Sequence, residues 1–255
     1  MIIVAGGDSF IWGSELADSP HGGPDGYSKN TFTALLSHGH QYICAAYPGN
    51  GNDSISRQVI NFLQVQGNSK IFVIVSWTFP GRYEFNFGFD SKIPNWQVIN
   101  HWTIGNKFYS KNNEHKKLIS DHVNKAKLNN VYDFAVNYFQ YVASSEYWET
   151  YATIKEILFL QSFLQSKKIP YLFTCADASF LNNSTILSND LTINAYYENI
   201  DFSKWFFFPG NKGFYEWATH NKYPIGDTHP LEAAHRDAAG LMKDKFYEMV
   251  KKHLE

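Results

Sequence analysis

Five short apolar runs limit the fold of this 255-residue chain more than any other feature of its sequence. Apolar residues are nearly continuous along each run and do not alternate with polar ones, which is typical of parallel strands buried on both faces. Segments with helical spacing of apolar residues separate the runs, so strand and helix alternate along the chain. We therefore predict a three-layer α/β fold with a doubly wound, mostly parallel five-stranded sheet in the order 2-1-3-4-5. The predicted strands are Ile2–Ala5, Tyr42–Ala46, Ile71–Trp77, Tyr171–Cys175 and Trp205–Phe208.

The segment of about residues 80–150 interrupts this alternation, between the third predicted strand and the helix before the fourth. Its first part, Pro80–Phe108, is rich in Asn, Gly and aromatic residues, and its second part, about Glu114–Ser144, has helical spacing. We predict a single domain over residues 1–255, with this segment inserted on the carboxyl side of the sheet as a lid beside an active site. A subdomain that only decorates the fold or forms a dimer is the alternative.

The charge balance argues against nucleic acid and membranes as partners. Charged residues make up 18% of the chain, the net charge is −2, and the basic residues are scattered. The sequence starts directly with a predicted strand, without the features of a signal peptide, and its longest apolar stretch, Ile71–Phe79, is too short to cross a bilayer. We predict a cytoplasmic protein with reduced Cys44 and Cys175, or a virion-associated one if a bacteriophage encodes it. Nothing in the sequence indicates an oligomeric state.

A serine follows the first predicted strand. The strand breaks at Gly6-Gly7 and leads into Asp8-Ser9, which places a hydroxyl group at the carboxyl end of a central strand. Ligands of open α/β sheets bind at that end, and several hydrolases expose a nucleophilic serine on such a strand-to-helix turn. Ser9 is therefore a candidate nucleophile, and a simple helix N-cap is the alternative.

A histidine with a nearby carboxylate precedes the last predicted helix. Residues 227–230 read Asp-Thr-His-Pro, and Pro230 suits the first turn of that helix. A serine needs a base to react near neutral pH, so we expect His229 to accept the proton of Ser9 and Asp227 to orient the imidazole. The alternative is that Asp227 only caps the helix. A metal site of Asp227, His229 and His235 is not expected, because residues six apart do not share one helix face.

These two segments resemble the first and last blocks of the SGNH (GDSL-type) hydrolases. The first block matches in Gly7-Asp8-Ser9, followed by Gly13 and Leu16, and the last block matches in Asp227-Thr228-His229. The resemblance implies a flavodoxin-like α/β fold, a Ser9–His229–Asp227 triad and hydrolysis of an ester without a cofactor or a metal. The family has its aspartate three residues before the histidine, whereas Asp227 lies two residues before His229.

The resemblance also implies a place for backbone donors to an oxyanion. The segment Ala45–Asp53, after the second predicted strand, is similar to the glycine block of the family. We therefore expect the N–H groups of Ser9 and Gly49 to stabilise the oxyanion, with Gly51 as the alternative to Gly49. An ordinary turn rich in Asn and Gly would also explain this segment.

The side-chain donor of the family is missing. Its third block reads Gly-x-Asn-Asp, whereas the third predicted strand here ends in Trp77-Thr78-Phe79. Loss of one oxyanion donor lowers the rate by roughly 10²–10³ unless another group replaces it. We expect Asn52 or Thr78 to be the replacement, and we favour Asn52 because a carboxamide reaches further than a hydroxyl.

Aromatic residues and one arginine are candidates for substrate binding. We expect an ion pair of Arg82 with Glu84 at the rim of the pocket, and at least one aromatic residue of the inserted segment facing Ser9. Tryptophan rings can stack on sugar rings or line an apolar cleft, although most tryptophans belong to the core. The candidates for binding are Trp77, Arg82, Trp96 and Trp102, and Phe85 and Phe87 are further candidates for the wall.

Two functions from different classes remain at this point. The first is a serine esterase or acyl hydrolase that cleaves an ester or O-acetyl group of a small molecule, with carbohydrate esters as one candidate class. The second is a catalytically idle SGNH-like fold that binds carbohydrate or assists bacteriophage assembly. The missing Gly-x-Asn-Asp block favours the second function, and the joint presence of Ser9, Asp227 and His229 favours the first.

Overall fold

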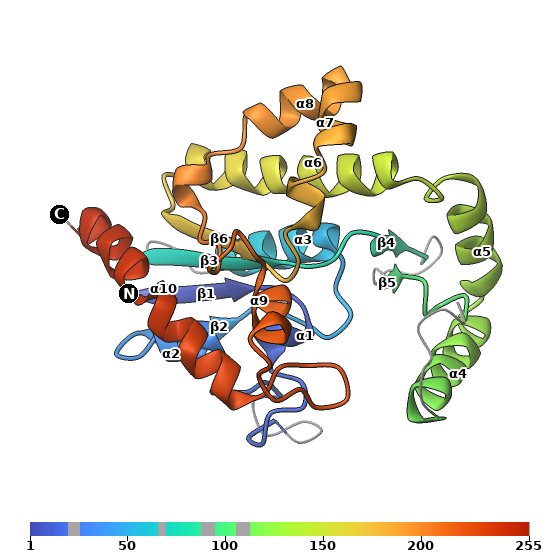
Figure 1. The fold of residues 1–255 in the computed structure, drawn as a ribbon, viewed down its shortest axis with the longest axis horizontal. Helices are drawn as coiled ribbons and strands as arrows, with labels where there is room; N and C mark the ends of the chain where they lie inside the picture. Colours follow the sequence, from blue (N-terminus) through green and yellow to red (C-terminus); the bar gives the residue numbers. More distant parts are fainter. Residues whose placement is uncertain (20–25, 66–69, 88–94, 106–112, 255) are drawn as a thin grey trace.

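The computed structural model describes residues 1–19, 26–65, 70–87, 95–105 and 113–254. Its centre is a parallel sheet of four strands in the order β2-β1-β3-β6 (Figure 1). The strands are β1 (Ile2–Gly6), β2 (Gln41–Cys44), β3 (Ile71–Trp77) and β6 (Tyr171–Cys175). They agree with the first four predicted strands in order and, to within two residues, in their bounds.

Helices cover both faces of this sheet (Figure 1). The helices of the described residues are α1 (Ser9–Trp12), α2 (Phe32–Leu36), α3 (Asn52–Gln64), α4 (Asn113–Leu128), α5 (Tyr132–Tyr141), α6 (Glu146–Ser166), α7 (Ser184–Asn189), α8 (Leu191–Glu198), α9 (Phe214–His220) and α10 (Glu232–Leu254), with 3-10 turns at Ser179–Leu181 and Phe202–Lys204.

Alternate residues of each strand point to opposite faces of the sheet, and both faces are buried. Val4 and Val73 belong to the apolar core under α3 and α6, whereas Ile3 and Phe72 belong to the core under α2 and α10. All four side chains are fully buried. Polar residues therefore do not alternate along these strands, which is why the apolar runs predict a three-layer fold correctly.

The prediction of a fifth strand is wrong. Trp205 forms one parallel bridge with Phe173 of β6, and the N–H of Phe206 donates to Phe173 O at 2.8 Å. The chain then turns back, because Phe208 and Lys212 bridge antiparallel to each other. The run is buried at both ends, so its apolar character reflects packing beside the sheet rather than a strand of its own.

The inserted segment forms a separate layer beyond the carboxyl end of β3 (Figure 1). Strands β4 (Tyr83–Asn86) and β5 (Trp96–Ile99) pair antiparallel, and α4 and α5 follow them. A small apolar core, which includes buried Ile99, Ala135 and Phe139, holds the hairpin and α5 together. The segment thus lies on the predicted side of the sheet, and its helical part contains two helices.

Two further predictions concern the chain as a whole. Cys44 and Cys175 are both free, and β1 and β3 separate their strands in the sheet. In the part of the chain that the structure describes, every helix is too short or too polar to cross a membrane.

Candidate active site

Ser9 lies at the carboxyl end of β1, in a turn that only glycine permits. A Cβ atom on Gly7 would lie 2.3 Å from Cγ1 of Ile11, so a side chain there would prevent α1 from folding back so tightly. Asp8, not Ser9, caps α1, because its carboxylate accepts a hydrogen bond from the N–H of Phe10 at 3.0 Å. Capping therefore leaves the hydroxyl group of Ser9 available for another partner.

That partner is His229. Its Nε2 atom lies 2.7 Å from Oγ of Ser9, although the two residues are 220 positions apart in the chain. His229 sits on the loop before α10, and its ring packs edge-on against Phe10 of α1 with 5.1 Å between the ring centres. The predicted contact between Ser9 and His229 is confirmed.

The carboxylate on the other side of the imidazole belongs to Glu15. Its Oε1 lies 2.5 Å from His229 Nδ1 and accepts a hydrogen bond from Oγ1 of Thr228 at 2.9 Å. The backbone N–H groups of Thr228 and His229 donate to Oε2 at 3.1 and 3.3 Å. With Nδ1–H directed at Glu15, Nε2 can accept the proton of Ser9.

The surroundings of Glu15 keep it ionised. Partial burial opposes ionisation, but the hydrogen bond and charge interaction with His229, together with the hydrogen bonds from Thr228, outweigh burial and lower the pKa of Glu15 to about 2. The backbone of Glu15 is left-handed, with a φ of 70°. A residue other than glycine in this conformation costs roughly 1–3 kcal/mol, and such strain is concentrated at functional sites.

Asp227 does not contact His229, so its predicted role in orienting the imidazole is wrong. The N–H of Gly226 donates to the carbonyl oxygen of His229 at 2.9 Å, which closes a turn and leaves Asp227 exposed on it. A Cβ atom on Gly226 would lie 2.3 Å from Oε2 of Glu15. The carboxylate of Glu15 therefore occupies the space that a side chain at position 226 would need. Asp227 does not cap α10 either, since the helix begins at Glu232.

The two predicted side-chain donors to an oxyanion are engaged elsewhere. Oδ1 of Asn52 accepts a hydrogen bond from the N–H of Thr78 at 2.9 Å, and its Nδ2 donates to Thr78 O and to Oγ1 of Thr153, both at 3.3 Å. The hydroxyl of Thr78 donates to Oδ2 of Asp8 at 2.5 Å. Asn52 and Thr78 thus tie the end of β3 to α3, α6 and the turn before Ser9, and neither points its donor at Ser9.

The loop that contains Gly49 and Gly51, after β2, is hydrogen-bonded to the turn between β1 and Ser9. Nδ2 of Asn50 donates to Gly7 O at 3.0 Å. Gly49, with a φ of 84°, is the third residue of a turn closed by the hydrogen bond from the N–H of Asn50 to Tyr47 O at 3.2 Å. Gly51 caps α3, and a Cβ atom there would lie 2.6 Å from the carbonyl oxygen of Arg82. The loop therefore lies beside Ser9, as predicted, and the donor role of Gly49 or Gly51 stays a prediction.

Arg82 reaches this network, but its predicted partner is wrong. Its Nη1 donates to Oδ2 of Asp8 at 3.1 Å and to the carbonyl oxygen of Asn50 at 3.4 Å. Glu84 instead binds Arg57 of α3, with Oε2 accepting from Nε and Oε1 from Nη2, both at 2.6 Å. Arg82 directly precedes β4 and Glu84 lies on it. Each side chain therefore pairs with a different charged residue, Arg82 with Asp8 and Glu84 with Arg57.

The four aromatic residues of the inserted segment that were predicted to face Ser9 make their ring contacts elsewhere. Trp77 is completely buried against Phe173 in the core, so its predicted role in substrate binding is wrong. The other candidates pack within the inserted segment or on α3: Phe85 and Phe87 on Phe134, Trp96 under Arg57, and Trp102 on His122. Phe10 packs against the imidazole, and Phe79 and Tyr215 contact Phe10 and each other.

His235, the second histidine of this region, belongs to the core. Its Nδ1 accepts a hydrogen bond from the N–H of Phe32 at 3.2 Å, and its ring packs against those of both Phe32 and Phe214. Burial, with a smaller contribution from nearby His229, lowers the pKa of His235 to about 3, so it is neutral at neutral pH. No cluster of three or more His, Cys, Asp or Glu side chains suited to a metal occurs among the described residues.

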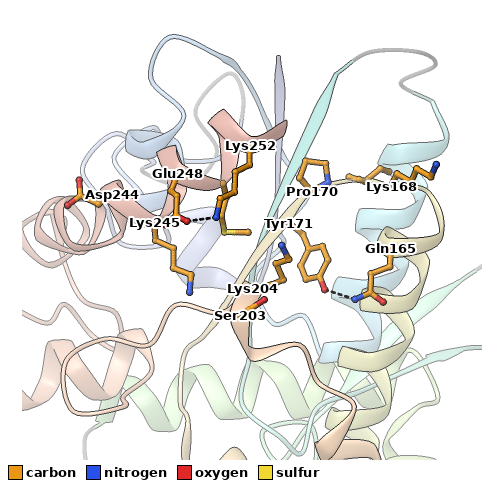
Figure 2. Close-up of a pocket in the computed structure, with 12 residues that line it drawn as sticks. Gln165, Lys168, Pro170, Tyr171, Ser203, Lys204, Asp244, Lys245, Glu248 and Lys252 are labelled. Carbon is orange, nitrogen blue, oxygen red and sulfur yellow. Dashed lines mark hydrogen bonds and ion pairs between the residues drawn. The ribbon is translucent and has the colours of Figure 1, made fainter. Parts of the chain in front are cut away.

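A groove lies at the amino end of β6 (Figure 2). This groove has a volume of about 640 Å³ and lies between the amino end of β6 and the last turns of α10. Its polar lining consists mainly of lysine side chains and two carboxylates of α10, Asp244 and Glu248. Ser9 follows the carboxyl end of β1, whereas the groove lies at the amino end of β6. Because the strands are parallel, the groove and the Ser9–His229 pair lie at opposite ends of the sheet.

Comparisons of this chain with models of protein families, with curated proteins and with solved structures found no match.

Proposed function

We propose that the protein is a serine esterase or acyl hydrolase with a Ser9–His229–Glu15 triad. The observation that carries this proposal is the 2.7 Å contact between Oγ of Ser9 and Nε2 of His229, with a carboxylate 2.5 Å from the other ring nitrogen. Serine, histidine and acid in this order of contact form the arrangement that activates a serine in unrelated hydrolases.

In the proposed reaction, Oγ of Ser9 attacks the carbonyl carbon of the ester while its proton moves to Nε2 of His229. The electron pair of the C=O bond moves to the oxygen, and the oxyanion forms. When the tetrahedral intermediate collapses, the C–O bond to the alcohol breaks, and the departing oxygen takes the proton from Nε2. Water then attacks the acyl group with His229 again as the base, and the acid and free Ser9 are released. Glu15 stabilises the imidazolium in both halves of the reaction.

The position of Glu15 also supports the resemblance to the SGNH hydrolases. Gly226 lies three residues before His229, at the position of the family's aspartate, and the Glu15 carboxylate fills the space beside it. We propose that this chain is a divergent member in which the acid comes from the turn after Ser9. The substrate class is an ester or O-acetyl group of a small molecule, including carbohydrate esters.

One observation favours the second function, an idle SGNH-like module that binds carbohydrate or assists bacteriophage assembly. The predicted side-chain donors, Asn52 and Thr78, make structural hydrogen bonds, so neither replaces the family's asparagine.

Labelling with a fluorophosphonate separates the two functions, because this reagent reacts with activated serines. We expect the parent protein to be labelled on Ser9 and to hydrolyse p-nitrophenyl acetate, and the Ser9→Ala variant to do neither. Ser14→Ala, a serine in the same turn, is the matched control and keeps both properties. A folded parent protein that is neither labelled nor active would support the idle module.

A further inference from the structure

We infer that Arg82 supplies the side-chain donor that stabilises the oxyanion, in place of the missing asparagine. This inference rests on the proposed hydrolase function. It concerns a residue that the sequence suggests only as a binding residue at the rim, and it assigns to Arg82 a role in the chemical step.

The position of Arg82 carries the inference. Through Nη1, Arg82 contacts Oδ2 of Asp8 at 3.1 Å and the carbonyl oxygen of Asn50 at 3.4 Å. Asp8 directly precedes Ser9, and Asn50 lies between Gly49 and Gly51. The guanidinium group therefore bridges the two segments whose backbone N–H groups are the candidate donors. An oxyanion formed at Ser9 has to lie beside these same segments.

Among the described residues, Arg82 also keeps N–H groups that make no hydrogen bond. A guanidinium group has five N–H donors in one plane, and both of these hydrogen bonds use Nη1. The side chain is 23% exposed, so a ligand at the surface can reach it, whereas the carboxylate of Asp8 is buried. The Phe79 ring lies 5.4 Å from Cζ of Arg82 and restricts the guanidinium group on one side.

The neighbouring polar side chains cannot take this role without losing existing bonds. Asn52 and Thr78 are engaged with β3, α6 and Asp8. Nδ2 of Asn50 donates to Gly7 O and to Oε1 of Gln58. A cationic donor is stronger than the neutral amide it would replace, since hydrogen bonds with a charged partner are roughly twice as strong.

Arg57 provides a matched control in the same region. Like Arg82, it is partly exposed, at 26%, forms an ion pair with a buried carboxylate and has an aromatic ring near its guanidinium group. Unlike Arg82, it binds its carboxylate with two nitrogen atoms, Nε and Nη2, and it contacts neither Asp8 nor Asn50 in the described structure. If a partly buried arginine were needed only for stability, the two substitutions would have similar effects.

The test compares Arg82→Gln, Arg82→Lys and Arg57→Gln in the full chain, with p-nitrophenyl acetate as substrate. We expect Arg82→Gln to lower kcat by roughly 10²–10³ with little change in KM, because the donor acts in the transition state. Arg82→Lys keeps the positive charge but loses the planar guanidinium group, so its kcat should lie between those of the parent and Arg82→Gln. Arg57→Gln should leave kcat within about threefold of the parent among molecules that remain folded.

Two further measurements separate a direct role from a merely structural one. Guanidinium ion at concentrations that do not denature the protein should raise the activity of Arg82→Ala and not that of Arg57→Ala. In an Asp8→Asn background, Arg82→Gln should still lower kcat, because a direct contact with the oxyanion does not depend on the ion pair.

Three results would overturn the inference while the parent protein remains active: an Arg82→Gln variant with kcat within threefold of the parent, a rise of KM alone, or a loss that disappears in the Asp8→Asn background. The second of these results would identify Arg82 as a binding residue for the ground state. If the folded parent protein is neither labelled nor active, the proposed function itself fails, and this inference fails with it.

Discussion

The two ends of the parallel sheet differ in how firmly they hold their polar side chains. At the carboxyl end, Ser9, His229 and Glu15 are connected by contacts of 2.7 and 2.5 Å, and the loop before α10 donates further hydrogen bonds to Glu15. At the amino end there is a groove of about 640 Å³, and its polar lining consists mainly of lysines and the carboxylates of Asp244 and Glu248 (Figure 2). The candidate site is therefore identified by preorganised contacts rather than by the size of a hollow.

The largest effect in this comparison is expected from Glu15. Glu15→Gln removes the negative charge that stabilises the imidazolium and replaces one carboxylate oxygen with an NH2 donor, which favours the wrong tautomer of His229, so kcat on p-nitrophenyl acetate should fall by roughly 10⁴. Asp227→Asn is the matched control, because this exposed carboxylate does not contact His229. It should change kcat by only about twofold, as a surface substitution of ~0.5 kcal/mol does. The opposite result, a large loss with Asp227→Asn alone, would restore Asp227 as the acid.

A second pair of variants tests whether the Glu15 carboxylate takes the place that an aspartate at position 226 would occupy. Gly226 lacks the positive φ that would exclude other residues, so an aspartate there is blocked mainly by Glu15, whose Oε2 lies 2.3 Å from where the new Cβ atom would be. In an inactive Glu15→Ala background, Gly226→Asp should recover part of the activity. In the parent background, the same substitution should lower activity through the clash.

Sequence reasoning predicts the Ser9–His229 pair but not its acid, and the reason is physical. The two motifs adjoin a strand end and a helix start, and the order of parallel strands brings those ends together. Which carboxylate reaches Nδ1 depends on the turn at Gly226–His229 and on the left-handed backbone of Glu15, which no local pattern specifies. The spacing to Gly226 is the signal that could have suggested an acid from elsewhere.

The next effect concerns Asn52, which makes structural hydrogen bonds at the carboxyl end of β3. Asn52→Ala removes three hydrogen bonds that join β3, α3 and α6, so the free energy of unfolding should fall by about 1–3 kcal/mol. Urea denaturation measures this loss, and Thr153→Val, which removes only one of the bonds, should cost less. An unchanged stability together with a 10²–10³-fold fall of kcat would instead make Asn52 an oxyanion donor.

The sequence could not distinguish these roles of Asn52, because a buried carboxamide at a helix start can face either the active site or the core.

The fifth apolar run presents the same difficulty. Burial makes Trp205 and Phe208 apolar whether or not they extend the sheet, and the bend that ends their pairing is fixed by the bridge to Lys212. Apolar patterns thus predict burial well, and they predict the direction of polar groups or the continuation of pairing poorly.

A smaller effect is expected from His235, a buried neighbour of His229. Its pKa is about 3 in the folded protein and near 6.5 when unfolded, so below pH 6.5 the unfolded state binds more protons. The contribution of His235 to stability is therefore complete above pH 6.5 and is lost as the pH falls toward 3, by up to about 1.4 kcal/mol per pH unit. His235→Asn keeps an acceptor for the N–H of Phe32 but does not titrate.

The measurement is the free energy of unfolding of the parent and of His235→Asn between pH 7.5 and 4.5. The variant should be less stable at pH 7.5, because it loses the ring contacts with Phe32 and Phe214, and the difference should shrink as the pH falls. A difference that does not change with pH would mean that His235 does not bind a proton on unfolding in this range.

The smallest effect tests the other end of the sheet. Lys204 and Lys245 line the groove and lie near Glu248, whose pKa is lowered by its hydrogen bond with Lys252 and, to a smaller extent, by these two lysines (Figure 2). Exposed pairs of this kind contribute little, because water and salt screen them. Lys204→Ala combined with Lys245→Ala should therefore leave kcat and KM for p-nitrophenyl acetate within about twofold of the parent. The ester is neutral, so the loss of two positive charges does not change its long-range electrostatic attraction to the protein. A change in kcat or KM would therefore report on the Ser9–His229 pair itself. A loss of tenfold or more with an unchanged melting temperature would show that the groove affects the Ser9–His229 pair through the sheet, and the contrast between the two ends would then be wrong.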